Sequence, residues 1–207
     1  MRMHRKILTP NQEALLPLIK KFSSTFGLVG GTAVALHLGH RRSIDFDLFT
    51  NEHINLRTIQ STIRKGGEIQ KILTKGEGEL TLLINNVKCT FFEYPFPIPF
   101  SEKFEDIIQL PNLLTLAAMK AYALGRRAKW KDYVDLYFIA TRYNGLQKIV
   151  ERGKKLFQGE FNEKIFRVQL AYFEDIDYGE AVEFMDGYAV SDEKIRDTLQ
   201  KFSLDKL

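Results

Sequence analysis

The sequence holds little that would link the chain covalently or retain it in a membrane. Among its 207 residues there is one cysteine, Cys89, so no internal disulfide can form and a reducing compartment is expected. The longest stretch without formal charge, residues 22–40, contains serines and a Gly-Gly pair and is too polar to cross a membrane. The basic start of the chain leads into Pro10, Asn11 and Glu13 instead of the apolar run of a secretory signal. We therefore expect a cytoplasmic protein with no membrane partner.

An excess of charge of one sign is also lacking. Thirty Lys and Arg residues against 26 Asp and Glu residues leave a formal net charge of +4, which permits an anionic partner without requiring one. This balance excludes a histone-like protein. Apolar residues make up 44% of the chain and charged residues 27%, which is ordinary for a globular protein and argues against disorder.

Helical and strand patterns alternate in the first half of the chain. Apolar–polar alternation predicts a strand over residues 43–49. Residues 80–84 and 87–93 have the composition of strands, and Asn85-Asn86 between them suits a two-residue hairpin turn. We therefore expect a small mixed sheet backed by helices.

The second half of the chain has a different character. Three prolines within residues 94–100 predict an extended connector, because proline has no main-chain N–H to donate. Beyond it the apolar spacing predicts helices only, over residues 112–124, 131–142, 146–157, 160–172 and 192–202. The expected fold class is therefore α+β, with an α/β core over residues 1–108 and a helical C-terminal domain over residues 109–207.

A Gly-Gly-Thr turn is the first pattern that bears on chemistry. A short apolar run ends at Gly30-Gly31, and Thr32 is expected to cap a helix over residues 33–38. Glycines let a ligand approach the main chain, and a helix start offers unpaired N–H groups and a positive dipole end. The arrangement suits a phosphate group, although an ordinary tight turn explains the same residues.

A pair of aspartates follows on the next expected strand. The spacing of Asp45 and Asp47 places both carboxylates on one face of a sheet, where they repel unless a cation lies between them. Such a pair commonly holds Mg²⁺ beside a triphosphate. The alternative is the solvated face of an amphipathic strand. The phosphate-friendly turn one helix upstream makes the metal interpretation the more specific one.

Taken together, these patterns resemble a known group of enzymes. Gly30-Gly31-Thr32, a short helix and Asp45-x-Asp47 resemble the signature of the DNA polymerase β-type nucleotidyltransferase superfamily. ALHLGHRRSIDFDLFT over residues 35–50 and MKAYALGRRAKWKDYVDLYFI over residues 119–139 resemble the AbiEii/AbiGii-type nucleotidyltransferases, which are the toxin halves of abortive-infection toxin–antitoxin pairs. The resemblance spans roughly residues 27–140 and implies a polymerase β-like mixed sheet.

The resemblance also implies an activity and a set of site residues. The activity is transfer of a nucleotide from an NTP, with Mg²⁺ or Mn²⁺, to an RNA such as tRNA or to a protein; a cognate antitoxin would be a further partner. Carried over residue by residue, it assigns nucleotide binding to Gly30, Gly31, Thr32, Lys120, Lys131 and Asp132, metal binding to Asp45 and Asp47, and catalysis to Asp45, Asp47 and Asp135.

The later residues of this set have plainer explanations as well. Lys120 is the only charged residue within 112–124, so it either extends its ammonium to water or meets an anion. Asp135 lies one helical turn after Lys131, and the two could form an ordinary helix pair. The basic run over residues 126–131 suits either a solvated helix junction or a landing surface for a triphosphate or nucleic acid.

One feature departs from the enzyme pattern. Enzymes of this superfamily usually add a third carboxylate from a neighbouring strand, and pairing across the hairpin puts Thr90 at that position, with Glu79 the nearest acid on the same face. Either the base comes from elsewhere, with Asp135 a candidate, or one metal suffices, or catalysis has been lost. The alternative function is then a non-catalytic nucleotide-binding or protein-interaction module, and a second is a plain nucleic-acid-binding protein that uses the basic run.

The C-terminal half also contains an acidic segment: residues 172–188 include six Asp or Glu residues and no Lys or Arg. It suits a solvated loop, a docking surface for a basic partner or a shield for the basic groove.

Overall fold

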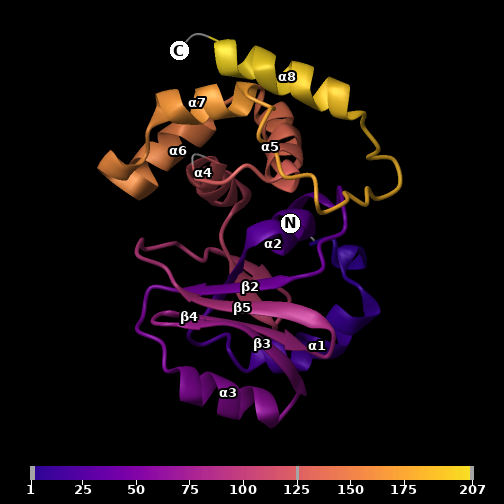
Figure 1. Cartoon of the computed structure of the whole chain (residues 1–207), viewed down its shortest axis with the longest axis vertical. Helices are drawn as coiled ribbons and strands as arrows, with labels where there is room; N and C mark the ends of the chain where they lie inside the picture. Colours follow the sequence, from indigo (N-terminus) through magenta and orange to yellow (C-terminus); the bar gives the residue numbers. More distant parts are fainter. Residues whose placement is uncertain (1–2, 125, 206–207) are drawn as a thin grey trace. The chain divides into compact units, whose positions relative to one another are not determined.

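The computed structural model describes residues 3–124 and 126–205, and the chain divides into two compact units, Met1–Asn112 and Leu113–Leu207 (Figure 1). The division falls after Asn112 instead of after residue 108, where the sequence placed it. The reason is that Ile108–Leu110 form strand β7, which pairs antiparallel with β6 (Glu102–Phe104) of the first unit.

The first unit begins with a short 3₁₀ helix, η1 (Arg5–Ile7), and helix α1 (Pro10–Lys20). Thr9 caps α1 in a reciprocal arrangement: its hydroxyl accepts from the backbone N–H of Gln12 at 3.2 Å, and the Gln12 amide oxygen accepts from the backbone N–H of Thr9 at 3.0 Å. Two unpaired donors at the helix start are satisfied in this way.

A five-stranded mixed sheet forms the centre of the first unit, as the sequence indicated. The strands lie in the order β1-β2-β5-β4-β3, with β2 and β5 parallel and the other neighbours antiparallel. Helix α2 (Gly30–Leu38) joins β1 to β2, and helix α3 (Leu56–Arg64) joins β2 to β3 (Figure 1). The strands are β1 (Gly27–Val29), β2 (Phe46–Thr50), β3 (Ile69–Gly76), β4 (Glu79–Ile84) and β5 (Val87–Glu93).

The expected hairpin is confirmed at β4 and β5. Asn85 and Asn86 have φ values of 47° and 64°, the left-handed conformation that a tight two-residue hairpin turn needs and that asparagine tolerates. The strand expected over residues 43–49 begins later, at Phe46. Ile44 is 55% exposed and Asp45 precedes the strand, so the apolar alternation at Ile44 does not belong to the sheet.

One face of the β4–β5 hairpin is fully apolar. Its residues on the hairpin are all buried, as the alternation predicted: Leu80, Leu82, Ile84, Val87, Cys89 and Phe91. The ring of Phe91 contacts Phe22, which follows α1, with ring centroids 4.8 Å apart, and also Phe26 at 5.4 Å. The opposite face is therefore the one left for polar chemistry, and it carries Asp47 and Thr90.

The second unit is helical, as expected. Its helices are α4 (Leu113–Leu124), α5 (Trp130–Tyr143), α6 (Gln147–Phe157), η2 (Gln158–Glu160), α7 (Glu163–Ala171) and α8 (Asp192–Leu204). Helix α7 begins only at Glu163 because Asn162 caps it, accepting from the backbone N–H of Ile165 at 3.0 Å. Stacking of Tyr122 on Phe157, with centroids 4.1 Å apart, joins α4 to α6. Across the described ranges, no helix is both long enough and apolar enough to cross a bilayer.

Candidate functional site

The start of α2 lies against the carboxylate of Asp47. Strands β1 and β2 pair Val29 with Asp47, so the next residue, Gly30, reaches the aspartate side chain. Gly30 has φ +69°, and a Cβ placed on it would overlap the Asp47 carboxylate, with Cγ at 2.9 Å. The structure thus brings the Gly-Gly turn and the second aspartate of the pair into direct contact.

Thr32 has a different place from the one expected. Helix α2 begins at Gly30 and its N-cap residue is Val29, so Thr32 lies inside the helix and the prediction that it caps the helix is wrong. Its hydroxyl donates to the backbone oxygen of Asp45 and lies 3.0 Å from the Ser43 hydroxyl. Thr32 therefore fixes the backbone just before β2, and with it the position of Asp45.

A buried arginine supports the same turn. Arg41 is only 2% exposed, and its Nη1 donates to the backbone oxygen of Arg42 at 2.8 Å. A Cβ on Gly31 would lie 2.8 Å from Nη2 of Arg41, so the guanidinium packs closely against the glycine. Nothing in a local sequence pattern indicates that Arg41 is buried.

Lys88 is a residue of this site that the sequence argument did not single out. Its Nζ lies 2.6 Å from Oδ2 of Asp45, and both side chains are partly exposed. The ammonium supplies positive charge next to the Asp45 carboxylate. Lys88 lies two residues before Thr90 on β5, so the two side chains are on the same, polar face of the sheet. This spacing is the sequence signal that could have identified Lys88.

The negative charge of the aspartates reaches the neighbouring strand. Burial raises the pKa of the Cys89 thiol well above its ordinary value, and the charges of Asp45 and Asp47 raise it further. Cys89 is therefore a protonated, inert core residue and not a nucleophile.

The position of the missing third acid is settled by strand register. Thr90 lies opposite Asp47 on one side and Thr81 on the other, while Glu79 lies opposite Phe92, farther along the hairpin. Within residues 3–124 and 126–205, no three His, Cys, Asp or Glu side chains are grouped as a metal site. Asp45 and Asp47 are the two carboxylates that could hold a cation at this place, and the position opposite Asp47 on β5 is Thr90.

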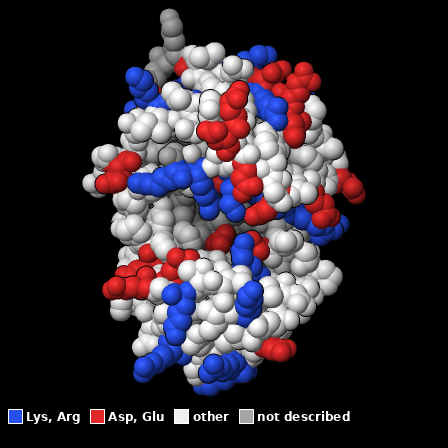
Figure 2. Space-filling view, in the orientation of Figure 1, with Lys and Arg blue, Asp and Glu red and all other residues white. Residues whose placement is uncertain are grey.

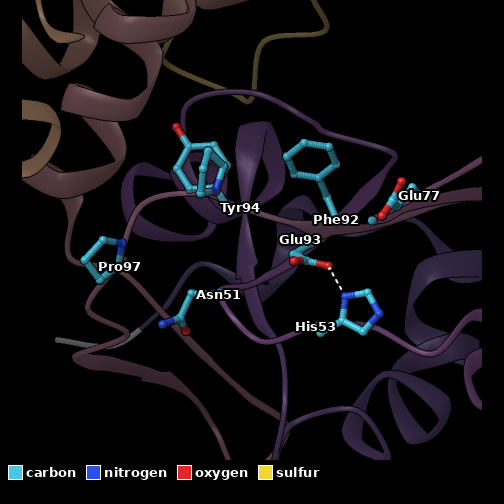
Figure 3. Close-up of a pocket in the computed structure, with 9 residues that line it drawn as sticks. Asn51, His53, Glu77, Phe92, Glu93, Tyr94 and Pro97 are labelled. Atoms are coloured by element: carbon cyan, nitrogen blue, oxygen red, sulfur yellow. Dashed lines mark hydrogen bonds and ion pairs between the residues drawn. The ribbon is translucent and has the colours of Figure 1, made fainter.

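A separate pocket lies at the far end of the same strands. It has a volume of about 390 Å³ and is lined by Asn51, His53, Glu77, Gly78, Phe92, Glu93, Tyr94, Pro95 and Pro97. Figure 3 shows His53 directed toward Glu93, whose Oε2 is 3.1 Å from Nδ1 of the ring. Because Glu77 and Glu93 make this pocket electronegative, it is unsuited to a phosphate group.

In the second unit, Lys120 is the centre of a buried ion cluster. Its Nζ lies 2.6 Å from Oδ1 of Asp132 and 2.8 Å from Oδ2 of Asp135, and all three side chains are at least nine-tenths buried. Arg127 approaches the other oxygen of Asp132, Oδ2, at 3.3 Å. The Lys120 ammonium therefore does not extend to water; it contacts two carboxylates of its own unit.

The helix pair suggested for Lys131 and Asp135 is wrong. Asp135 turns into the core, where Lys120 of α4 reaches it, and Lys131 pairs instead with Glu180. Asp135 is fully buried. A base that meets a substrate hydroxyl needs access to the substrate, so this burial suits a role in positioning Lys120 better.

Glu180 joins two lysines at the start of α5. Its Oε1 is 3.0 Å from Nζ of Lys129, and its Oε2 is 3.1 Å from Nζ of Lys131. The hydrogen bond from Lys129, followed by that from Lys131, lowers the pKa of Glu180 from 4.5 to about 2. Of the site residues expected from sequence, Gly30, Gly31, Thr32, Asp45 and Asp47 thus gather in the first unit and Lys120, Lys131, Asp132 and Asp135 in the second.

Comparison with known proteins gives a consistent result. The family model described as "Nucleotidyl transferase AbiEii toxin, Type IV TA system" matches residues 18–202. The uncharacterized protein aq_aa25 of Aquifex aeolicus (strain VF5) is 32% identical over 176 residues, which cover 83% of this chain and 85% of that protein.

Solved structures show the same fold. A putative nucleotidyltransferase from H. pylori matches with a TM-score of 0.60 and 18% identity, covering 93% of this chain and 91% of that one. MenT4, the nucleotidyltransferase toxin Rv2826c from Mycobacterium tuberculosis H37Rv, matches with a TM-score of 0.62 and 15% identity, covering 93% and 80%. At such identities the likeness concerns the fold, and it confirms the nucleotidyltransferase architecture expected from the sequence.

Proposed function

This chain belongs to the AbiEii family of nucleotidyltransferase toxins, and we propose that it transfers a nucleotide from an NTP to a hydroxyl group of an RNA or a protein, with a divalent metal ion held by Asp45 and Asp47. The observation that carries this proposal is the contact between the Gly30 backbone and the Asp47 carboxylate. Because of that contact, a phosphate at the start of α2 and a cation at the aspartates would be neighbours.

The residues at the aspartates fit a hard cation. Carboxylate oxygens are the ligands that Mg²⁺ and Mn²⁺ prefer, and Mg²⁺ commonly uses one or two carboxylates together with phosphates and water. Asp45 and Asp47 supply such a pair. A bound metal would stabilise the negative charge that develops on the phosphate oxygens.

The turn supplies the complementary half. Gly30, Gly31 and Thr32 begin α2, a helix of nine residues whose first N–H groups have no intrahelical acceptor. We assign the phosphates of the NTP to these N–H groups. In the second unit, the family resemblance assigns nucleotide binding to Lys120, Lys131 and Asp132. We keep that assignment in this proposal.

The reaction needs few groups beyond these. The acceptor oxygen bonds to the α-phosphorus, the bond from that phosphorus to the bridging oxygen breaks, and pyrophosphate leaves while the acceptor proton passes to solvent or to a base. Thr90 carries a neutral hydroxyl where a carboxylate would accept the proton, so it cannot serve as that base. Positioning and charge stabilisation would therefore provide most of the rate enhancement. NTP and an RNA acceptor would place the activity in the cytoplasm, and a cognate antitoxin would restrain it.

The test is transfer of label from each α-³²P-labelled NTP to total cellular RNA and protein, with Mg²⁺ or Mn²⁺. The wild type is compared with the Asp45→Asn/Asp47→Asn variant and with Glu79→Gln, a matched loss of one carboxylate on the same sheet face. Label moved by the wild type and by Glu79→Gln, but not by the aspartate variant, supports the proposal. Label moved equally by the aspartate variant contradicts the site.

The second candidate is a module that binds nucleotide without turnover. The observation that favours it is Thr90, which lies opposite Asp47 where an acid is expected. Binding of an NTP with the metal, without label transfer to RNA or protein from any NTP, would make this the better account.

A further inference from the structure

The acidic segment, residues 172–188, is fastened to the basic run within the second unit. The backbone N–H of Trp130 donates to the oxygen of Asp177 at 3.1 Å, and the N–H of Asp177 donates to the oxygen of Ala128 at 2.8 Å. These bonds make a short parallel bridge between Lys129 and Asp177. The acidic segment is a largely exposed loop, as one of the interpretations from the sequence held, and it is anchored to the basic run at Asp177.

Aromatic contacts hold the acidic segment beside this bridge. The rings of Trp130 and Tyr178 lie 5.3 Å apart, and Nη2 of Arg196 donates to the Tyr178 hydroxyl at 2.7 Å. The Arg196 guanidinium also lies over the Trp130 ring, 5.6 Å from its centroid. Two residues after Tyr178, the chain brings the carboxylate of Glu180 to Lys129 and Lys131.

The two lysines hold Glu180 in the way that they would hold a phosphate. Each carboxylate oxygen contacts a different ammonium, and a phosphate also presents adjacent oxygens that accept from separate donors. One carboxylate carries a single negative charge against two ammonium groups, whereas a phosphate group of a triphosphate or of an RNA competes for the same two donors. The side chains of Lys129 and Glu180 are 41% and 45% exposed, so a competing anion can reach this ion pair from solvent.

We propose that Lys129 and Lys131 form a phosphate-binding site and that Glu180 occupies it as an intramolecular competitor. The acidic segment then shields the site until a substrate phosphate displaces Glu180. The inference rests on the proposed function, because that function identifies the phosphate as one of the NTP or of the RNA acceptor. The chemistry, a phosphate held by two ammonium groups, is the same for both sources.

Charge distribution agrees with local competition. On the face drawn in Figure 2, basic and acidic side chains are interspersed, so an approaching phosphate meets local pairs instead of a single uniform field. Removing one specific acid should therefore matter more than lowering the overall negative charge.

The experiment measures binding by the full chain without metal, so that no transfer is needed. The probes are inorganic triphosphate and a fluorescein-labelled single-stranded RNA of about 12 nucleotides. Glu180→Gln is compared with Glu174→Gln, which removes the same charge from the acidic segment away from the two lysines. Trp130, the only tryptophan of the chain, reports displacement of Tyr178 through its fluorescence.

We expect Glu180→Gln to bind at least one probe roughly three- to tenfold more tightly than the wild type, with Glu174→Gln unchanged. Adding Lys129→Gln and Lys131→Gln should abolish the gain. A gain with triphosphate alone assigns the site to the NTP, and a gain with RNA alone assigns it to the acceptor. In the wild type, saturating probe should change Trp130 fluorescence, a readout that needs no variant to fold.

Equal binding by Glu180→Gln and the wild type overturns the proposal, as does a gain that survives loss of both lysines. Unchanged Trp130 fluorescence at saturation excludes displacement of the segment. These outcomes are independent of catalysis: a chain that transfers no nucleotide but shows the expected binding contradicts the proposed function and leaves the phosphate site standing. An active enzyme with unchanged binding contradicts this inference alone.

Discussion

The main chain of Gly30 lies directly against the carboxylate of Asp47, with no room for a Cβ between them. Pairing of Val29 with Asp47 across β1 and β2 sets this contact, and the positive φ of Gly30 turns the chain into α2. The turn proposed to bind phosphate and the acid proposed to bind metal are therefore one structural feature, and neither can be changed without the other.

Gly30→Ala should remove activity while leaving most of the fold intact. Alanine at a positive φ costs about 1–2 kcal/mol, and the new methyl group would displace the Asp47 carboxylate. A displacement of about 1 Å at a reacting centre commonly lowers rate on the order of 100-fold. Label transfer and urea unfolding measure the two effects.

The control for this variant is Gly76→Ala. Gly76 ends β3, and a Cβ there would meet no atom within 4 Å. Near wild-type activity is expected for it. If Gly30→Ala were as active as Gly76→Ala, the close contact with Asp47 would have no catalytic consequence.

Lys88→Gln should lower the metal concentration needed for half-maximal activity. The Lys88 ammonium is 2.6 Å from Asp45 and competes with a cation for that carboxylate. Its removal should strengthen metal binding by roughly two- to fivefold, as expected for one partly exposed ion pair. Titration of transfer activity with Mg²⁺ and Mn²⁺ is the measurement.

Lys71→Gln, an equal change at an exposed position of β3, is the matched control for Lys88. If the Lys88→Gln protein stayed inactive at every metal concentration, Lys88 would have a direct part in the reaction.

Lys120→Met should destabilise the second unit strongly. It would leave Asp132 and Asp135 buried without the ammonium that contacts both, a loss of about 3–5 kcal/mol. Lys155→Met, at an exposed position of α6, should change the free energy of unfolding by less than about 0.5 kcal/mol. Urea unfolding followed by circular dichroism compares the variants.

Adding Asp135→Asn to Lys120→Met should recover part of the lost stability, because it removes one of the two buried carboxylate charges that Lys120 contacts in the wild type. A fully folded Lys120→Met protein without nucleotide binding would show that the lysine serves the ligand and not the fold.

The attachment of Glu180 to its two lysines should persist in acid. Its pKa is lowered from 4.5 to about 2, chiefly by the hydrogen bond from Lys129 and also by Lys131. A carboxyl whose pKa is lowered by folding stabilises the folded form above its ordinary pKa, and this contribution is lost as the pH falls from 4.5 through about 2.

Trp130 fluorescence, recorded from pH 7 downward, tests this attachment. The wild type should keep its emission through pH 4.5 and change only toward pH 2, whereas Glu180→Gln should lack that transition. Circular dichroism over the same range separates detachment of the segment from general acid unfolding. A wild-type transition centred at 4.5 would show that the lysines do not hold Glu180 in solution.

Much of the fold follows from local patterns. The positive φ of Asn85 and Asn86 and the buried alternation on β4 and β5 match what the sequence predicts, because turn chemistry and burial parity act over a few residues. The prediction that α2 begins after Thr32 is wrong, and the reason is also local. Gly30 at φ +69° lets the helix begin before Thr32, although threonine is the better capping residue.

By itself, the sequence determined the alternation of helices and strands up to β5, the helical character of the second unit, the family, and the presence of Asp45 and Asp47 one helix after a Gly-Gly turn. Only the tertiary structure decided which charged groups meet: Lys88 with Asp45, Lys120 with Asp135, and Glu180 with Lys129 and Lys131. Tight turns and the hydrogen bonds within helices depend on near neighbours along the chain. An ion pair depends on which distant segments the packing brings within about 4 Å of each other, and no local pattern records that.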